Sequence, residues 1–442
     1  MKPIMVVTAP VGTRSGYGAH SRDICRSLID LDKFDVRIWP VRWGNTPQNA
    51  LSEQNPQDLP IIKRLLQKPE IERQPDIHVH IVVPNEFQPI AKYNIGITAG
   101  IETTAVPPAW LDGLNKMDLN IVPAKFVKHT IENTKFDKHH ETTKEKIGEL
   151  KSTKPVEVLF EGVDTDLYGL TNEFSKELVD EFKDIKEDFC FLHVGHWLQG
   201  SLGEDRKDIG MLVKVFCESF KNQKNPPALI LKTSGATPCI LDREEILGKI
   251  RDIKKQVSGQ LPNIYVLHGD LRDEEINQLY NHPKVKAHVS FTHGEGFGRP
   301  LLEASLSGKP VIVTNWSGQV DFLNSDALLL PGSLVDVPKD SFPKEFIVEG
   351  AKWFQVNYQY ASNVLKEVFK NYTKYLTKSK KLSIVNKTKF SLDEMTKSFG
   401  KILDKHLPKF EEQPQKVDIK LPQLKKVSKP KKVELPKLKK VN

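Results

Sequence analysis

KAHVSFTHGEGFGRPLLEASLSGKPVIVTNWSGQVDFL, residues 286–323, carries the clearest signal of fold class in this chain. It begins with a short apolar run at 287–291, whose length and alternation are typical of a β-strand. Three glycines follow at every second position, and Pro300 then opens a short helical pattern that ends at Gly308. Residues 309–314 read as a fully buried strand of a parallel sheet. The segment therefore predicts strand, glycine loop, helix and strand, the repeating unit of a doubly wound sheet.

The glycine loop is also the first candidate for a binding site. Gly294, Gly296 and Gly298 leave the loop without side chains, so its backbone N–H groups can approach a phosphate closely. Ligands of parallel sheets bind at the carboxyl ends of the strands, where this loop lies. Glu295 and Glu303 add two carboxylates that can accept hydrogen bonds from neighbouring sugar hydroxyls. Taken singly, Glu303 could merely complement the helix dipole and Glu295 could be a solvated loop residue.

Strand and helix patterns alternate through the rest of the chain. This alternation predicts two Rossmann-like, doubly wound α/β domains that face a cleft. A final helix is expected after the capping-box sequence at 391–394, and a long helix is expected over 346–376. The apolar or alternating runs that predict strands are 4–8, 35–39, 76–83, 94–98, 120–123, 156–160, 189–194, 228–233 and 264–268.

Bulk properties narrow the class of protein. The first residues lack the apolar run of a signal peptide, and no stretch approaches 18 uninterrupted apolar residues, so we expect an intracellular chain that does not span a membrane. His78 and His80 share one strand face, but without a third ligand packing is favoured over a metal site. The four cysteines have no metal-site or paired spacing and are expected to be structural thiols: Cys25, Cys190, Cys217 and Cys239.

Charge is concentrated at the end of the chain. Residues 416–442 hold ten lysines and two acidic residues, a net charge of 10 − 2 = +8 that equals the net charge of the whole chain. The folded body is thus close to neutral and gives no electrostatic reason to expect nucleic acid as a partner. The lysine- and proline-rich tail repeats one motif at 421–427 and 435–441 and is expected to be disordered. It could bind anionic lipid headgroups or only keep the protein soluble.

Residues 295–304 (EGFGRPLLEA) resemble the E-x7-E motif of the group 1 glycosyltransferases, retaining enzymes with the GT-B fold that use nucleotide sugars. Gly318 and Asp321 stand where that family has a glycine and a Glu. The resemblance implies that Glu303 binds the ribose of the donor and that Glu295 lies against the donor sugar. It places the donor-binding loop and helix at Gly294, Gly296, Phe297, Gly298 and Leu301.

The resemblance extends over nearly all of residues 1–405, most specifically over 190–325, with some departures. Arg206 and Lys207 precede a predicted helix at the position of the family's diphosphate-binding basic residues, while His196 replaces the usual arginine. Glu102 stands where many members carry a catalytic-site histidine. It is counted with Glu295, Arg206 and Lys207 as catalytic. By resemblance, Gly16 and Gly18 of the first glycine-rich turn lie at the cleft, and Ala124 replaces a serine. No cofactor or metal is expected, and the D-x-D sequence at 164–166 falls outside the context that such a metal motif requires.

The resemblance implies four parts: an acceptor-side domain (1–165), a nucleotide-sugar-binding domain (166–385), a helix that crosses back to the first domain (386–408) and the tail (409–442). The implied activity transfers a sugar from a UDP- or GDP-linked donor to an acceptor hydroxyl with retention, in glycan or glycolipid synthesis. The implied acceptor is a glycan, a lipid-linked molecule or a protein. The implied location is the cytoplasm, and the lysine-rich tail could add peripheral contact with a membrane. The alternative is a non-catalytic nucleotide-sugar-binding module tethered by its tail. An NAD-dependent oxidoreductase is disfavoured because the dinucleotide fingerprint is missing.

Overall fold

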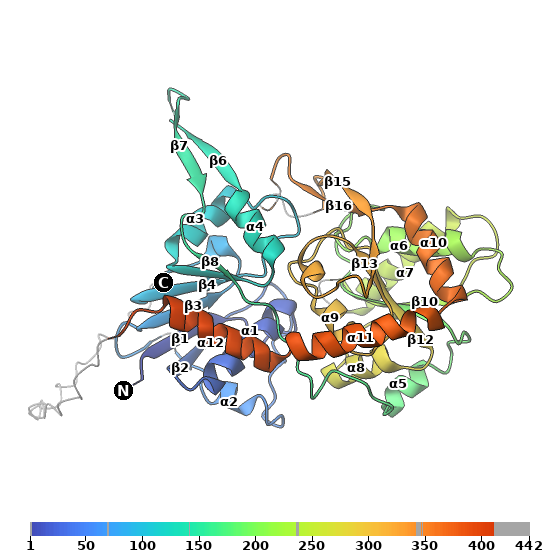
Figure 1. Cartoon of the computed structure of the whole chain (residues 1–442), viewed down its shortest axis with the longest axis horizontal. Helices are drawn as coiled ribbons and strands as arrows, with labels where there is room; N and C mark the ends of the chain where they lie inside the picture. The colour runs from blue at the N-terminus through green and yellow to red at the C-terminus, as the bar shows by residue number, and fades with distance from the viewer. Residues whose placement is uncertain are drawn as a thin grey trace, which may run out of the picture. The chain divides into compact units, whose positions relative to one another are not determined.

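Two six-stranded sheets organise the chain (Figure 1). The structure is a computed structural model that describes residues 2–68, 70–140, 142–235, 238–341, 346 and 348–410. The first sheet has the spatial order β2 (Asp35–Pro40), β1 (Ile4–Ala9), β3 (Ile77–Ile81), β4 (Tyr93–Ile97), β5 (Leu119–Val122) and β8 (Val156–Val158). The second has the order β11 (Ile264–Leu267), β10 (Ala228–Lys232), β9 (Cys190–Val194), β12 (Val285–Ser290), β13 (Val311–Thr314) and β14 (Leu328–Leu330). All neighbouring strands in both sheets run parallel, which confirms the predicted fold of two doubly wound α/β domains.

Helices connect the strands in each half. Those that follow strands of the first sheet are α1 (Gly16–Asp30), α2 (Leu59–Ile62), α3 (Pro108–Lys116) and α4 (Lys125–Asn133). α5 (Lys176–Glu181) precedes the first strand of the second sheet. The helices between or after strands of that sheet are α6 (Ile209–Phe220), α7 (Ile240–Lys255), α8 (Asp273–Asn281), α9 (Arg299–Ser305), α10 (Tyr358–Lys370) and α11 (Thr373–Lys389). Short 3-10 turns lie at η1 (Pro84–Glu86) and η2 (Gly318–Asp321).

The second sheet is covered on both faces because its strands are apolar on both faces. Successive side chains of a strand point to opposite sides, so each strand contributes to two separate hydrophobic clusters. One cluster includes Phe191, Leu229, Leu231 and Ile312 with residues of α6, α7 and α10. The other includes Cys190, Leu192, Ile230 and Val313 with residues of α8, α9 and α11.

The predicted helix over 346–376 is wrong for part of its length. Residues Lys352–Val356 form strand β16, which pairs antiparallel with β15 (Gly332–Asp336). The aromatic and β-branched residues of KWFQV suit a strand. Asn357 then ends it by capping α10, with its side chain accepting from the Tyr360 N–H at 2.9 Å. A second hairpin, β6 (Lys135–His139) with β7 (Lys146–Lys151), was also not predicted.

The last helix, α12 (Leu392–His406), begins at the expected capping residue, since the Ser391 hydroxyl accepts from the Glu394 N–H at 3.2 Å. It packs against α1 (Figure 1), and Ser27 and Thr396 join the two helices by a hydroxyl hydrogen bond of 2.7 Å. Residues 2–408 form one compact unit. The predicted domain boundaries stay predictions, and residues 411–442, which hold nearly all of the basic tail, lie outside the described residues.

The cysteines and the paired histidines of β3 have the surroundings of structural residues. All four cysteines are free, three of them buried and Cys239 exposed. His78 is buried and its ring nitrogens contact the Gln88 carbonyl and the Thr8 hydroxyl, while His80 accepts from the Gln88 N–H, so both rings serve packing. No helix within the described residues is long and apolar enough to cross a membrane.

Candidate functional site

The glycine loop after β12 is held in place by contacts with segments of both sheets. From the second sheet, the Glu295 N–H donates to the Ser317 hydroxyl at 2.9 Å and the Gly318 N–H donates to the Glu295 carbonyl at 2.9 Å. From the first sheet, the segment after β4 lies directly against the loop. A Cβ on Gly296 would be 2.0 Å from the Ala99 carbonyl oxygen. Glycine is therefore required here for the close approach of two backbone segments from different halves of the chain.

Glu295, at the centre of this loop, is buried with only 8% of its surface exposed. Its carboxylate forms an ion pair with the Lys207 ammonium, and its other oxygen lies 3.8 Å from Arg206 Nη1. Burial alone would raise the pKa of Glu295, but Lys207 and then Arg206 outweigh burial and hold the pKa below its ordinary value. Glu295 is thus a carboxylate whose charge is fixed by two cations.

Glu102 completes what we call the four-charge cluster: Glu102, Arg206, Lys207 and Glu295. Its Oε1 lies 2.6 Å from Arg206 Nη1, and it comes from the segment after β4, whereas Arg206 precedes α6. Burial lowers the pKa of Lys207 even though Glu295 acts in the opposite direction. The cluster has two positive and two negative side chains, so without a ligand the cations expected to receive a diphosphate are neutralised by carboxylates of the protein itself.

Glu303 lies in α9 and belongs to a second set of contacts, the arginine bridge, formed by Asp23, Arg299 and Glu303. Arg299 Nε donates to Glu303 at 2.9 Å and Arg299 Nη1 donates to Asp23 at 2.5 Å. The Tyr280 hydroxyl also donates to Glu303, at 3.4 Å. Burial raises the pKa of Glu303 to about 7, although Arg299 acts against burial. The bridge joins α1 of the first half to α9 of the second.

The sequence interpretation missed Asp23 in this bridge and two residues beside it, Tyr280 and Glu161. Glu161 is buried and burial raises its pKa to about 7, with Arg299 acting in the opposite direction. The signal that could have found it is an acidic residue directly after the last strand of the first sheet, where ligands of such sheets bind.

The first glycine-rich turn holds the segment that covers the loop. Ser15 caps α1 by accepting from the Gly18 N–H at 3.0 Å. The Tyr17 hydroxyl contacts the Thr98 hydroxyl at 2.9 Å and accepts from the Ala99 N–H at 3.0 Å, which fixes the segment after β4. A Cβ on Gly16 would meet nothing within 4 Å, so the space beside this glycine is open.

The other predicted donor-site residues lie in the hydrophobic core, at the start of a helix or on the surface. Phe297 and Leu301 are buried in the hydrophobic core, where Phe297 packs on Phe322 at 4.9 Å between ring centroids. Gly298 precedes α9 with a φ of 98°, a conformation that favours glycine. His196 is exposed and its Nδ1 lies 3.3 Å from the Ser234 hydroxyl.

Asp321 and Ala124, which both depart from the family's usual residues, meet in the structure. Ala124 precedes α4 and has no side chain that can cap it. Asp321 supplies the cap, because its Oδ2 accepts from the Lys125 N–H at 2.9 Å. A carboxylate at a helix N-terminus also complements the helix dipole. This contact is a further link between the two halves.

Residues 254–345 match the model of the family described as glycosyl transferases group 1. The matched segment contains the glycine loop, Glu295 and Glu303. Among curated proteins, no sequence matches the chain.

The fold is that of GT-B glycosyltransferases, as comparison with solved structures shows. The Anabaena HepE structure with UDP and glucose has a TM-score of 0.57 and 13% identity, covering 91% of this chain and 100% of HepE. Sucrose-phosphate synthase from Thermosynechococcus elongatus has a TM-score of 0.59 and 11% identity, covering 92% and 99%. The E. coli structure described as trehalose-6-phosphate bound with UDP-2-fluoro glucose has a TM-score of 0.57 and 11% identity, covering 92% and 100%. At such low identity these comparisons establish the fold.

Proposed function

We propose that this protein is a glycosyltransferase that moves a sugar from a nucleoside diphosphate sugar to an acceptor hydroxyl. The observation that carries the proposal is the pairing of Glu295 with Lys207 and Arg206. This pairing places the two basic residues that precede α6 beside the first glutamate of the E-x7-E segment. The match of residues 254–345 to the group 1 family supports the same assignment.

The roles of the residues follow from their charge and position. Arg206 and Lys207 bind the diphosphate and stabilise the negative charge that it gains as the glycosyl bond breaks. They supply the positive charge that a divalent cation would otherwise supply, so the proposed reaction is metal-independent. Glu303 binds the ribose hydroxyls and Glu295 the donor sugar. Retention of configuration is proposed from the resemblance, and no carboxylate is assigned as a covalent nucleophile.

UDP is the proposed nucleotide. The similar structures of HepE and of the E. coli protein hold UDP, UDP-glucose or UDP-2-fluoro glucose. We carry this ligand over to the present chain as a proposal, with GDP-sugars as the comparison to be tested.

The test is a panel of UDP- and GDP-sugars, measured by thermal shift and by donor hydrolysis on the wild type, Glu303→Ala and Glu132→Ala. Glu132 is an exposed glutamate of α4 and serves as the control. We expect one UDP-sugar to raise the melting temperature of the wild type and of the control but not of Glu303→Ala. Hydrolysis should fall by roughly tenfold or more in Glu303→Ala.

The proposal is overturned if no donor raises the melting temperature, or if Glu303→Ala responds like the wild type. A donor that binds but is neither hydrolysed nor transferred to any acceptor favours the non-catalytic binding module. Glu303→Gln, which keeps the size of the side chain, separates loss of the carboxylate charge from loss of packing around Tyr280 and Arg299.

A further inference from the structure

A strongly basic region, separate in sequence from the four-charge cluster, lies in α10 and α11. Residues 358–389 contain eight lysines and one glutamate, a net charge of 8 − 1 = +7. All eight lysines are exposed. With +8 in residues 416–442, the remaining chain carries 8 − 8 − 7 = −7. The positive charge of the described chain is therefore concentrated on one helix pair, which we call the basic helix pair.

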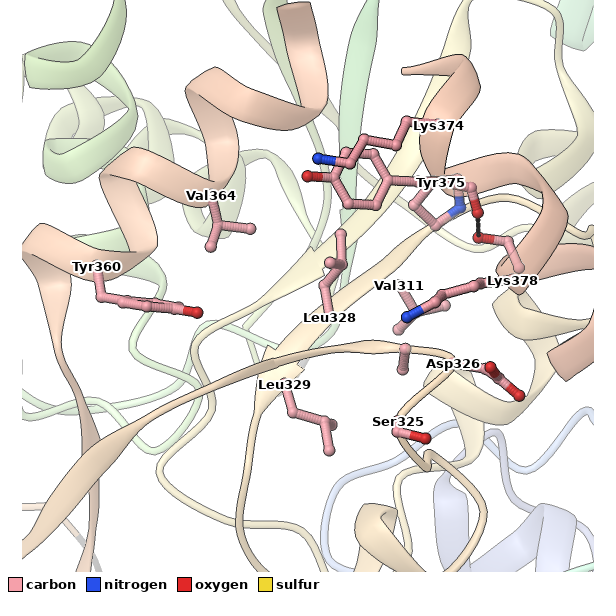
Figure 2. A pocket seen from close by; sticks show the side chains of 13 residues that line it. Val311, Ser325, Asp326, Leu328, Leu329, Tyr360, Val364, Lys374, Tyr375 and Lys378 are labelled. Carbon is pink, nitrogen blue, oxygen red and sulfur yellow. Dashed lines mark hydrogen bonds between the residues drawn. The ribbon is translucent and has the colours of Figure 1, made fainter. Parts of the chain in front are cut away.

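A pocket of about 450 Å³ opens between this helix pair and the edge of the second sheet. Strand β14 is the last strand of that sheet, so one side of the pocket is a sheet edge. Figure 2 shows apolar side chains from the sheet and from α10 at the pocket, with Leu328 and Leu329 pointing to opposite sides of β14 and with Tyr360, Lys374, Tyr375 and Lys378 around them. The apolar residues are Val311, Leu328, Leu329 and Val364. The volume falls within the range of small-molecule sites.

The lysines at this pocket differ in their partners. Lys374 lies 3.2 Å from Glu367, and Asp326, the acidic residue of the pocket lining, lies 3.0 Å from Lys381, one turn beyond the pocket. Lys378 has no ion-pair or hydrogen-bond partner among the residues that the structure describes, and Figure 2 shows its ammonium beside the apolar residues. Tyr360 is 48% exposed, which is unusual for a large aromatic ring. An unpaired cation and an exposed tyrosine therefore border an apolar pocket.

We infer that the basic helix pair docks on an anionic phospholipid membrane and that the pocket takes one phospholipid from it. The ligand is a phosphate diester joined to an apolar chain. Lys378 and Lys374 face the phosphate, and the side chains of Val311, Leu328, Leu329 and Val364 contact the first part of the chain. Tyrosine rings occupy the interface between headgroups and acyl chains, and exposed lysines are attracted to an anionic surface. This site is separate from the donor site and does not depend on the proposed reaction.

The first experiment measures binding of the full-length chain to vesicles by flotation. Vesicles of phosphatidylcholine alone are compared with vesicles of phosphatidylcholine and phosphatidylglycerol in equal parts. The test variant is Lys378→Glu/Lys380→Glu, and the control is Lys63→Glu/Lys138→Glu. All four lysines are exposed without an ion-pair partner among the described residues, and both variants change net charge equally while leaving the tail intact.

We expect wild type and control to bind the anionic vesicles and not the neutral ones, and the test variant to lose roughly tenfold or more in partitioning. Equal loss in both double variants would show that binding follows net charge or the tail, and would overturn the proposal. Equal binding to neutral and anionic vesicles, or no binding to either, would also overturn it.

A second measurement separates the pocket from the charged face. Val364→Phe places extra volume in the pocket without changing charge, and Tyr360→Ala removes the exposed ring should Val364→Phe fail to fold. Either variant should weaken anionic-vesicle binding several-fold while its thermal shift with UDP-sugar stays that of the wild type. Unchanged vesicle binding in both would exclude the pocket from the interface. Displacement of the protein from vesicles by dissolved glycerol phosphate would identify a site for a soluble phosphate instead and would overturn the membrane assignment.

Discussion

Glu102 Oε1 and Arg206 Nη1 lie 2.6 Å apart although 104 residues separate them in sequence. Glu102 follows the fourth strand along the chain in the first sheet, and Arg206 precedes the first long helix of the second half. An arginine expected to bind a diphosphate is therefore already paired with a carboxylate from the opposite half. In the proposed reaction a nucleotide would compete with Glu102 for this guanidinium, so we propose Glu102 as a determinant of donor affinity.

Replacement of Glu102 by Gln should strengthen binding of UDP. The substitution keeps the size of the side chain but removes the charge that competes with the diphosphate and repels it. Both partners are about one-fifth exposed, so we expect a gain of about fivefold in Kd, or about 1 kcal/mol. Isothermal titration of UDP against the wild type and Glu102→Gln measures this, with Glu132→Gln as the control. Weaker binding would mean that Glu102 itself contacts the ligand.

Gly296→Ala should damage both folding and donor binding, whereas Gly16→Ala should leave folding intact. The added methyl group at 296 would lie 2.0 Å from the Ala99 carbonyl oxygen, so one of the two backbone segments must move. The same group at 16 meets nothing within 4 Å. Melting temperatures and UDP affinities of the two variants are compared. Since Gly16 is predicted to lie beside the donor, loss of affinity without loss of stability in Gly16→Ala would support that position.

The sequence was sufficient to predict the two sheets because their strands are short apolar runs buried on both faces. Glu295 and Lys207 were assigned to one donor site by resemblance only, and in the structure they meet because both follow the carboxyl ends of adjacent strands. The sequence did not predict the pairing of Arg299 with Asp23, which lie 276 residues apart and meet only when the two halves are assembled. Strand β16 was predicted as helix because a connection of 15 residues, 337–351, separates it from its partner β15, so no tight turn marks the pair in the sequence.

Donor affinity should depend on pH through Glu303. A carboxylate accepts more hydrogen bonds from ribose hydroxyls than a protonated carboxyl does. With a pKa of about 7, Glu303 is mostly protonated at pH 6 and mostly ionised at pH 8, so affinity should rise by up to about tenfold across this range. A UDP-sugar is the ligand of choice because, unlike UDP, it has no terminal phosphate that titrates near pH 6. Glu303→Gln should bind weakly at every pH, and an equal pH dependence in that variant would assign the effect to another group.

The stability of the protein should depend on pH through Glu161. Burial raises its pKa from 4.5 to about 7, so its contribution to stability is present below pH 4.5 and is lost as the pH rises through about 7. The complete pKa shift corresponds to a change of roughly 3 kcal/mol in the free energy of unfolding. Glu161→Gln cannot ionise and should therefore gain melting temperature relative to the wild type at pH 8 but not at pH 4. A constant difference at both values, measured beside Glu132→Gln, would contradict this assignment.

Asp321 should stabilise the protein by capping α4 across the two halves. Asp321→Ala removes the acceptor for the Lys125 N–H and should cost about 1 kcal/mol, a typical value for the loss of an N-cap. Asp321→Asn keeps an acceptor oxygen and should cost less. Ala124→Ser offers a local cap at the residue that now lacks one, so the double variant Asp321→Ala/Ala124→Ser should recover most of the lost melting temperature. If the double variant is no more stable than Asp321→Ala, the role of Asp321 lies in joining the two halves, and the cap itself contributes little. If Asp321→Ala and the double variant both change the affinity for UDP to the same extent, that result would support a role for Asp321 in joining the two halves.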